Sequence, residues 1–170
     1  MSRLADPVAS GCRQLGDLLE QSLAEYVALR ALVARRRDAV RTANMRVLDE
    51  VLQEERQATA RIADLDRRRT EVAASLAKRT AVAQPTVTAI ATKAPEGERE
   101  RLLVLAARLR DEIEACRRES SVVRHAAEML AQHVSGILQT VHAAFGATKT
   151  YGRAGRLAVA TPIRTVDLKS

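Results

Sequence analysis

The sequence predicts an all-α protein: an elongated antiparallel bundle of three long, coiled-coil-like helices, with a short connector helix and a flexible C-terminal tail. Three observations support this prediction. Only 7 Gly and 4 Pro occur among 170 residues, and residues 17–84 contain neither. Aromatic residues make up 2 % of the chain, although 46 % of it is hydrophobic. Apolar residues also recur at three- and four-residue steps through most of the sequence, which is the helical period.

The first helix is predicted over about residues 7–42. Asp6 and Pro7 form a typical N-cap and first helical position. One apolar stripe follows, made of Leu15, Leu19, Leu23, Tyr26, Leu29 and Val33. Asn44 either ends this helix in the left-handed conformation or caps the next one.

The second helix is predicted over about residues 45–79, where the apolar stripe resumes between charged faces. The connector, 80–95, is rich in Thr and Ala and contains two prolines. We expect one short helical turn there, at 86–91.

The third helix, about 96–145, has the strongest signal in the sequence, because an apolar or small residue recurs every seven positions for six heptads. One register is Leu102, Leu109, Cys116, Val123, Leu130, Ile137 and Ala144, and the second is Ala106, Ile113, Ser120, Ala127, Val134 and Val141. Glu96 and Glu98 suit the first turn, and Gly146 suits the stop. Residues 1–146 therefore form the predicted helical domain, and 147–170 a basic, flexible tail.

The net charge of +7 is concentrated at the C-terminus. Residues 147–170 hold five basic residues and one acidic residue, which is +4 of the +7. The remaining helices are nearly balanced, so we do not expect nucleic acid as a partner. Two widely separated cysteines fit free thiols in the cytoplasm, and no apolar run is long enough for a membrane span. Asp6 and Pro7 interrupt any lipoprotein signal before Cys12.

No catalytic residue, cofactor site or metal site is predicted. The three histidines lack the spacing of a helical metal pair, as they stand at 125, 133 and 142. Cys116 lies on the heptad seam and is expected to pack as core. The arginine runs at 35–37 and 67–69 are read as solvated faces. Tyr151 lies outside the helical pattern, where it either docks against the bundle or anchors a partner.

The chain resembles the FlgN-type flagellar export chaperones over most of its length. The resemblance rests on long helices followed by a Tyr-Gly-x-x-Gly element, here Tyr151, Gly152 and Gly155. The opening residues 1–5 and the run 48–69 also look similar. The family often has two asparagines three apart in the last helix, and Ser120 and Val123 occupy those positions here.

This resemblance implies a non-enzymatic, cytoplasmic chaperone for the hook-filament junction proteins FlgK and FlgL. The apolar face beside the tail is the expected client contact: Leu130, Val134, Ile137, Val141 and Phe145. The resemblance further implies that Tyr151, Gly152 and Gly155 dock on the export gate protein FlhA, with the export ATPase as an additional candidate partner.

Two other classes share parts of the pattern. A non-flagellar coiled-coil adaptor or structural protein would show the same heptads and would self-associate without a secretion client. A basic helical nucleic-acid binder would show an affinity that falls steeply as salt rises.

Overall fold

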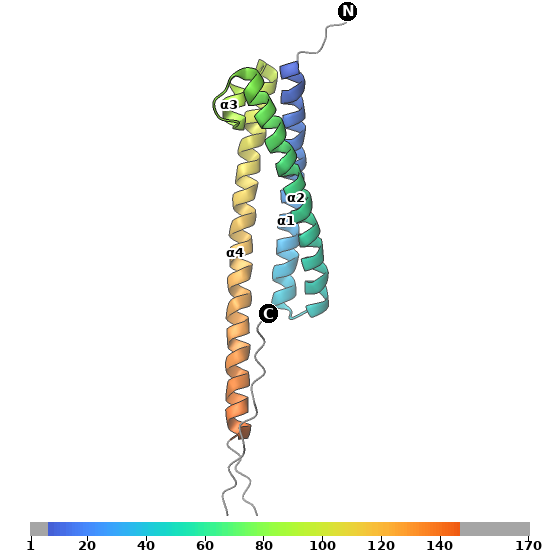
Figure 1. The fold of residues 1–170 in the computed structure, drawn as a ribbon. Helices are drawn as coiled ribbons and strands as arrows, with labels where there is room; N and C mark the ends of the chain where they lie inside the picture. Colours follow the sequence, from blue (N-terminus) through green and yellow to red (C-terminus); the bar gives the residue numbers. More distant parts are fainter. Residues whose placement is uncertain (1–6, 147–170) are drawn as a thin grey trace, which may run out of the picture. The chain divides into compact units, whose positions relative to one another are not determined.

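The computed structural model describes residues 7–146, and the side chains of residues 7–143. This part of the chain contains four helices and no strand, so the prediction of an all-α protein is confirmed. The helices are α1 (Pro7–Arg41), α2 (Met45–Thr80), α3 (Val87–Ala91) and α4 (Glu96–Gly146), as labelled in Figure 1. The chain divides into two compact units, residues 1–127 and 128–170. This division falls inside the range 1–146 that the sequence predicted as one helical domain.

The turn between α1 and α2 shows which of its two predicted roles Asn44 takes. The Asn44 side-chain oxygen accepts a hydrogen bond from the backbone N–H of Val47 at 3.2 Å, so it caps α2. Ala43 before it has φ of 51°, in the left-handed region. The helix break therefore comes from a capping side chain and one residue of unusual backbone conformation.

The connector is held by caps at both of its ends. Ala81 ends α2 in the left-handed conformation with φ of 53°, and the Thr86 hydroxyl accepts from the N–H of Ala89 to start α3. The Arg99 guanidinium donates to the carbonyls of Ala91 and Thr92, at 3.1 and 2.9 Å. These bonds satisfy the C-terminal carbonyls of α3 and tie it to the start of α4.

Helices α1 and α2 are antiparallel neighbours (Figure 1). The pairs Arg35–Glu54 and Arg61–Glu25 link the two helices, with residue numbers falling on one as they rise on the other. Hydrogen bonding to Glu25 raises the pKa of Arg61, so this guanidinium stays charged. Gly11 of α1 lies close to Leu76 of α2, because a Cβ added at Gly11 would come within 2.7 Å of Leu76 Cδ2.

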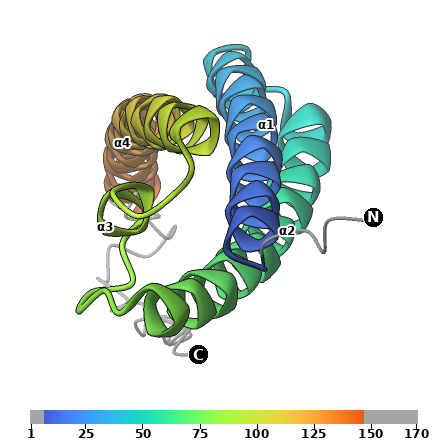
Figure 2. The same cartoon turned by 90° about the horizontal axis from the view of Figure 1, so that it is seen from above.

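Helix α4, over residues 96–127, runs in the same direction as α1. Arg101 pairs with Asp17 at 2.7 Å, and Arg30 pairs with Glu112 at 3.0 Å, so the numbers rise together on the two helices. Figure 2 shows α1 beside α2, and α3 beside the start of α4. Because α4 belongs partly to each unit, a single antiparallel bundle of three whole helices stays a prediction.

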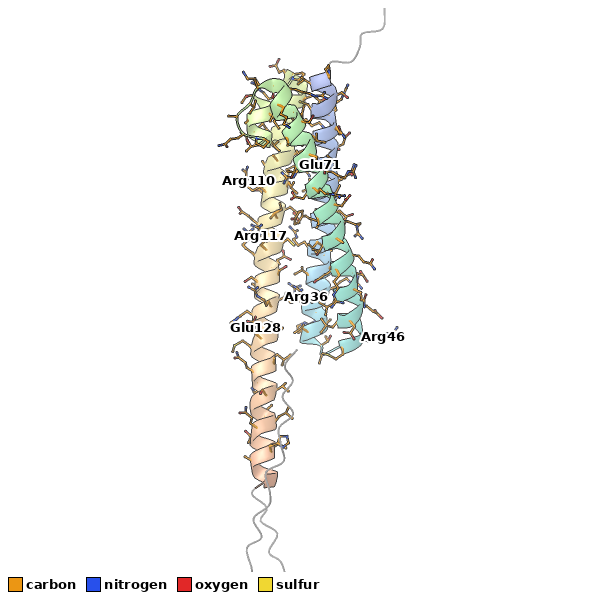
Figure 3. The ribbon with its side chains drawn as sticks, viewed as in Figure 1. Arg36, Arg46, Glu71, Arg110, Arg117 and Glu128 are labelled. Atoms are coloured by element: carbon orange, nitrogen blue, oxygen red, sulfur yellow. The ribbon has the colours of Figure 1, made fainter. Side chains whose placement is uncertain are left out.

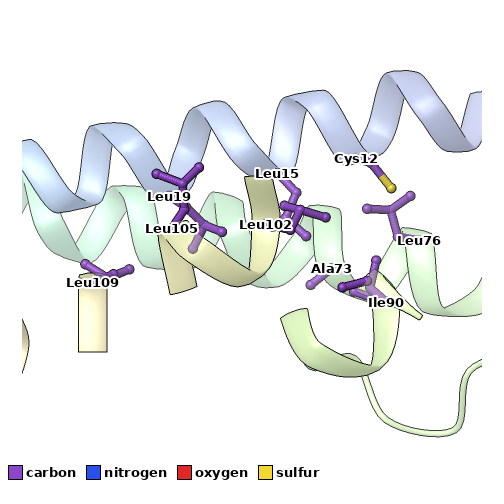
Figure 4. Packing of buried hydrophobic residues seen from close by; sticks show 10 residues of the cluster. Cys12, Leu15, Leu19, Ala73, Leu76, Ile90, Leu102, Leu105 and Leu109 are labelled. Atoms are coloured by element: carbon purple, nitrogen blue, oxygen red, sulfur yellow. The ribbon is translucent and has the colours of Figure 1, made fainter. Parts of the chain in front are cut away.

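The larger core cluster joins all four helices within residues 7–127 (Figure 4). Its buried members are Cys12, Leu15, Leu19, Ala73, Leu76, Ile90, Ala91, Leu102, Leu105 and Leu109. A smaller cluster follows further along α1 and α4, made of Val33, Cys116 and Val123, with Tyr26 and Leu29 packed against it. These two clusters place the first half of α4 against α1.

Candidate functional site

The heptad seam of α4 changes from buried to exposed along an unbroken helix. In the first register, Leu102, Leu109, Cys116 and Val123 are 0, 7, 5 and 4 % exposed. The next two members of the same register, Leu130 and Ile137, are 43 and 50 % exposed. The seven-residue period of apolar residues continues unchanged from Val123 to Leu130. The rise in exposure therefore reflects how much of the helix is covered by other residues.

The second register shows the same change. Ile113, Ser120 and Ala127 are half-buried, whereas Val134 and Val141 are 46 and 43 % exposed. The register of the ion pairs between α1 and α4 accounts for the position of the change. Partners on the two helices differ by 81–89 in residue number, so the end of α1 at Arg41 corresponds to a position near residue 127 on α4.

We call Leu130, Val134, Ile137 and Val141 the exposed seam. Met129 and Leu138 lie next to it and are each 54 % exposed. Residues 129–146 contain no Asp, Glu, Lys or Arg. Neither the seam nor its flanks thus carry the charged groups that normally solvate an exposed helix, and a cluster of large apolar side chains of this kind is typical of a protein-binding surface.

The structure brings together four of the five residues predicted to contact a client, on one exposed stretch of helix. The side chain of the fifth, Phe145, lies outside the described residues. The sequence reasoning did not select Met129 and Leu138. Both could have been found from composition, because they are large apolar residues in a stretch without any charge.

The predicted gate-docking element, Tyr151, Gly152 and Gly155, lies outside the described residues, as does the predicted flexible tail. Its role stays a prediction. At the two positions where the family often has asparagines, Ser120 is half-buried and Val123 packs in the smaller core cluster. In this chain Val123, at the second of these positions, is therefore a core residue.

Charged residues of the first unit hold its helices together. Arg30 reaches both Glu112 and Glu119 of α4, at 3.0 and 3.6 Å. Arg101 bridges back to Asp17 and Glu20 of α1, at 2.7 and 3.2 Å. Hydrogen bonding to Asp17 raises the pKa of Arg101, so it stays a cation. All of these pairs are partly exposed, and each contributes modestly to stability.

Cys116 packs in the core, as the sequence predicted. Burial raises the pKa of the Cys116 thiol above its ordinary value. A hydrogen bond with Ser120 lowers this pKa, and the nearby Glu119 and Glu112 carboxylates raise it. It is therefore a neutral thiol at physiological pH. Within residues 7–146, no group of three or more His, Cys, Asp or Glu side chains is placed to hold a metal ion. None of the described helices is both long and apolar enough to cross a membrane.

Fold and site together define a helical protein whose last helix exposes an apolar face. The family model described as FlgN protein matches residues 12–158. The chain belongs to the FlgN family, a family of flagellar export chaperones. No curated protein and no solved structure matches the chain.

Proposed function

We propose that this protein is a cytoplasmic export chaperone that binds the amphipathic terminal helices of FlgK and FlgL. The observation that supports the proposal is the exposed seam of α4, which continues a heptad pattern whose earlier members are buried. A terminal helix of a client that packs on this seam removes apolar surface of both partners from water.

The composition of the exposed seam predicts that client binding does not depend on charge. Residues 129–146 offer no ionic group to a partner, so affinity comes from apolar contact and is insensitive to salt. We expect the client segment, disordered when free, to gain helix on binding.

The direct test is calorimetric titration of the full chain with FlgK and FlgL terminal segments. The double variant Ile137→Ala, Val141→Ala is expected to weaken binding at least tenfold, since each removed methylene is worth about 0.8 kcal/mol when buried. The matched control is Leu103→Ala, Val104→Ala. These two residues are 41 and 50 % exposed on the same helix but lie outside both registers.

Binding that is equally strong in the seam variant and in the control variant contradicts the assignment of the seam. Tight self-association, with no binding of either client segment, favours the coiled-coil adaptor instead. An affinity for nucleic acid that collapses as salt rises favours the basic helical binder.

We further propose that the client is delivered to the export gate protein FlhA through Tyr151, Gly152 and Gly155, with the export ATPase as an additional partner. This step rests on family membership and on the Tyr-Gly-x-x-Gly element. Tyr151→Ala is expected to abolish FlhA binding and leave affinity for the client segment unchanged. Unchanged FlhA binding in this variant contradicts the docking role.

A further inference from the structure

A hollow of about 510 Å³ lies on α4 beside the exposed seam. The residues that line it are Gln132, His133, Gly136, Ile137, Thr140 and Val141. Two of them, Ile137 and Val141, belong to the exposed seam. All six are exposed and lie within the second unit. The hollow is therefore an open feature of the proposed client face and not part of a core.

Gly136 makes room in the hollow, because it contributes no side chain. In a coiled coil, a side chain of one helix inserts between four residues of the facing helix. These four stand at positions i, i+3, i+4 and i+7. The residues of the hollow with this spacing are His133, Gly136, Ile137 and Thr140. A Cβ added at Gly136 would meet no atom of the described residues within 4 Å, so the hollow can receive a large side chain.

Two glycines of α1, Gly11 and Gly16, lie where another helix comes close. A Cβ at Gly11 would come 2.7 Å from the Leu76 side chain of α2. A Cβ at Gly16 would come 3.1 Å from the Arg101 guanidinium of α4. Glycine inside a helix is less favourable than alanine, so its presence there usually has a packing reason. Gly136 lies inside α4 without such a neighbour among the described residues, which indicates that its neighbour belongs to a partner.

The surroundings of Gly136 favour an apolar occupant. Glu128, labelled in Figure 3, is the last acidic or basic residue of α4, since residues 129–146 contain no Asp, Glu, Lys or Arg. The Thr140 hydroxyl donates to the Gly136 carbonyl at 2.9 Å, so it is already bonded within the helix. A charged side chain buried here would have no ionic partner on α4, and burial of an unpaired charge is costly.

We propose that a leucine-sized or larger apolar side chain of the client helix inserts into this hollow over Gly136. This inference rests on the function proposed above, because the same client helix covers Ile137 and Val141. The contact of Leu76 with Gly11 is the precedent within this chain. Gly136 thus determines which client helices fit the exposed seam and in which register they bind.

The test is calorimetric titration of full-length variants with the FlgK and FlgL terminal segments. Gly136→Leu fills the hollow and is expected to weaken client binding about tenfold or more. Gly136→Ala adds one methyl group and is expected to stay within about threefold of the parent chain. Ser135→Leu is the matched control and should leave the affinity unchanged, because Ser135 is exposed on the same helix but does not line the hollow.

A second measurement identifies the inserted side chain of the client. Each Leu, Ile, Met and Phe of the client segment is replaced by alanine in turn and titrated against the parent chain and Gly136→Leu. One of these client variants is expected to bind Gly136→Leu about tenfold more tightly than the unaltered segment does, because its smaller side chain fits the filled hollow. Circular dichroism checks that Gly136→Leu folds, and Gly136→Met replaces it if it does not, with the same expectation.

Three results overturn this inference and leave the exposed seam as the client site, provided that Ile137→Ala with Val141→Ala still weakens binding. They are unchanged affinity in Gly136→Leu, equal losses in Gly136→Leu and in either Gly136→Ala or Ser135→Leu, and no client variant that restores binding. Failure of both client segments to bind the parent chain overturns the proposed function and this inference together. If Gly136→Leu then weakens self-association, a second copy of the chain occupies the hollow instead.

Discussion

Leu102 and Leu130 occupy the same register of the same helix, four heptads apart, and alanine at each should have opposite consequences. Leu102 is 0 % exposed and packs in the larger core cluster. Truncation removes about three methylene-sized groups at ~0.8 kcal/mol each and leaves a cavity, so we expect Leu102→Ala to cost about 2–5 kcal/mol. Leu130 is 43 % exposed, and Leu130→Ala should stay within about 0.5 kcal/mol of the parent protein.

Thermal unfolding followed by circular dichroism measures both effects. For a chain of this length, about 1 kcal/mol shifts Tm by roughly 2–4 °C, so a loss of about 3 kcal/mol at Leu102 lowers Tm by roughly 6–12 °C. Leu130→Ala should leave Tm nearly unchanged and weaken binding of the client segment. An equal fall in Tm for the two variants refutes the reasoning, because it means that the seam at Leu130 is already covered in the free protein.

Three further predictions follow from the packing of the first unit. Burial raises the pKa of Glu55 above 4.5, although a neighbouring arginine acts to lower it, so the stability due to this group is present below pH 4.5 and is lost as pH rises through the folded-state pKa. Urea midpoints between pH 4 and 7 should therefore fall less in Glu55→Gln than in the parent, and parallel profiles contradict this. A Cβ at Gly11 would lie 2.7 Å from Cδ2 of the buried Leu76, whereas nothing lies within 4 Å at Gly97. Gly11→Ala should lower the free energy of unfolding by about 1–3 kcal/mol and Gly97→Ala should not, as denaturant titration of the two variants will show. Mass spectrometry after exposure to a thiol reagent at pH 8 should find Cys116 modified at least about tenfold more slowly than glutathione, and an equal rate would show that this thiol is not buried.

The helical class was predictable because the period of apolar residues and the scarcity of glycine and proline act locally. The break at Asn44 was visible in the sequence, although two roles were open to it. The left-handed end of α2 was not predictable, since Ala81 occupies a position that glycine usually takes. The Arg99 bonds that cap α3 depend on how the connector folds back, which no local pattern encodes.

The candidate site was predictable in its residues but not in its limits. The heptads run without a change from Leu102 to Val141, so the sequence alone does not show where burial ends. That point depends on the length of α1 and on its register with α4.

The central claim is that the exposed seam binds a client helix of FlgK or FlgL, and calorimetric titration of the full chain at low and high salt tests it most directly. The account predicts one-to-one binding of micromolar affinity or tighter, insensitive to salt and accompanied by a gain in helicity, which Ile137→Ala with Val141→Ala weakens at least tenfold. The absence of binding to both client segments would contradict it.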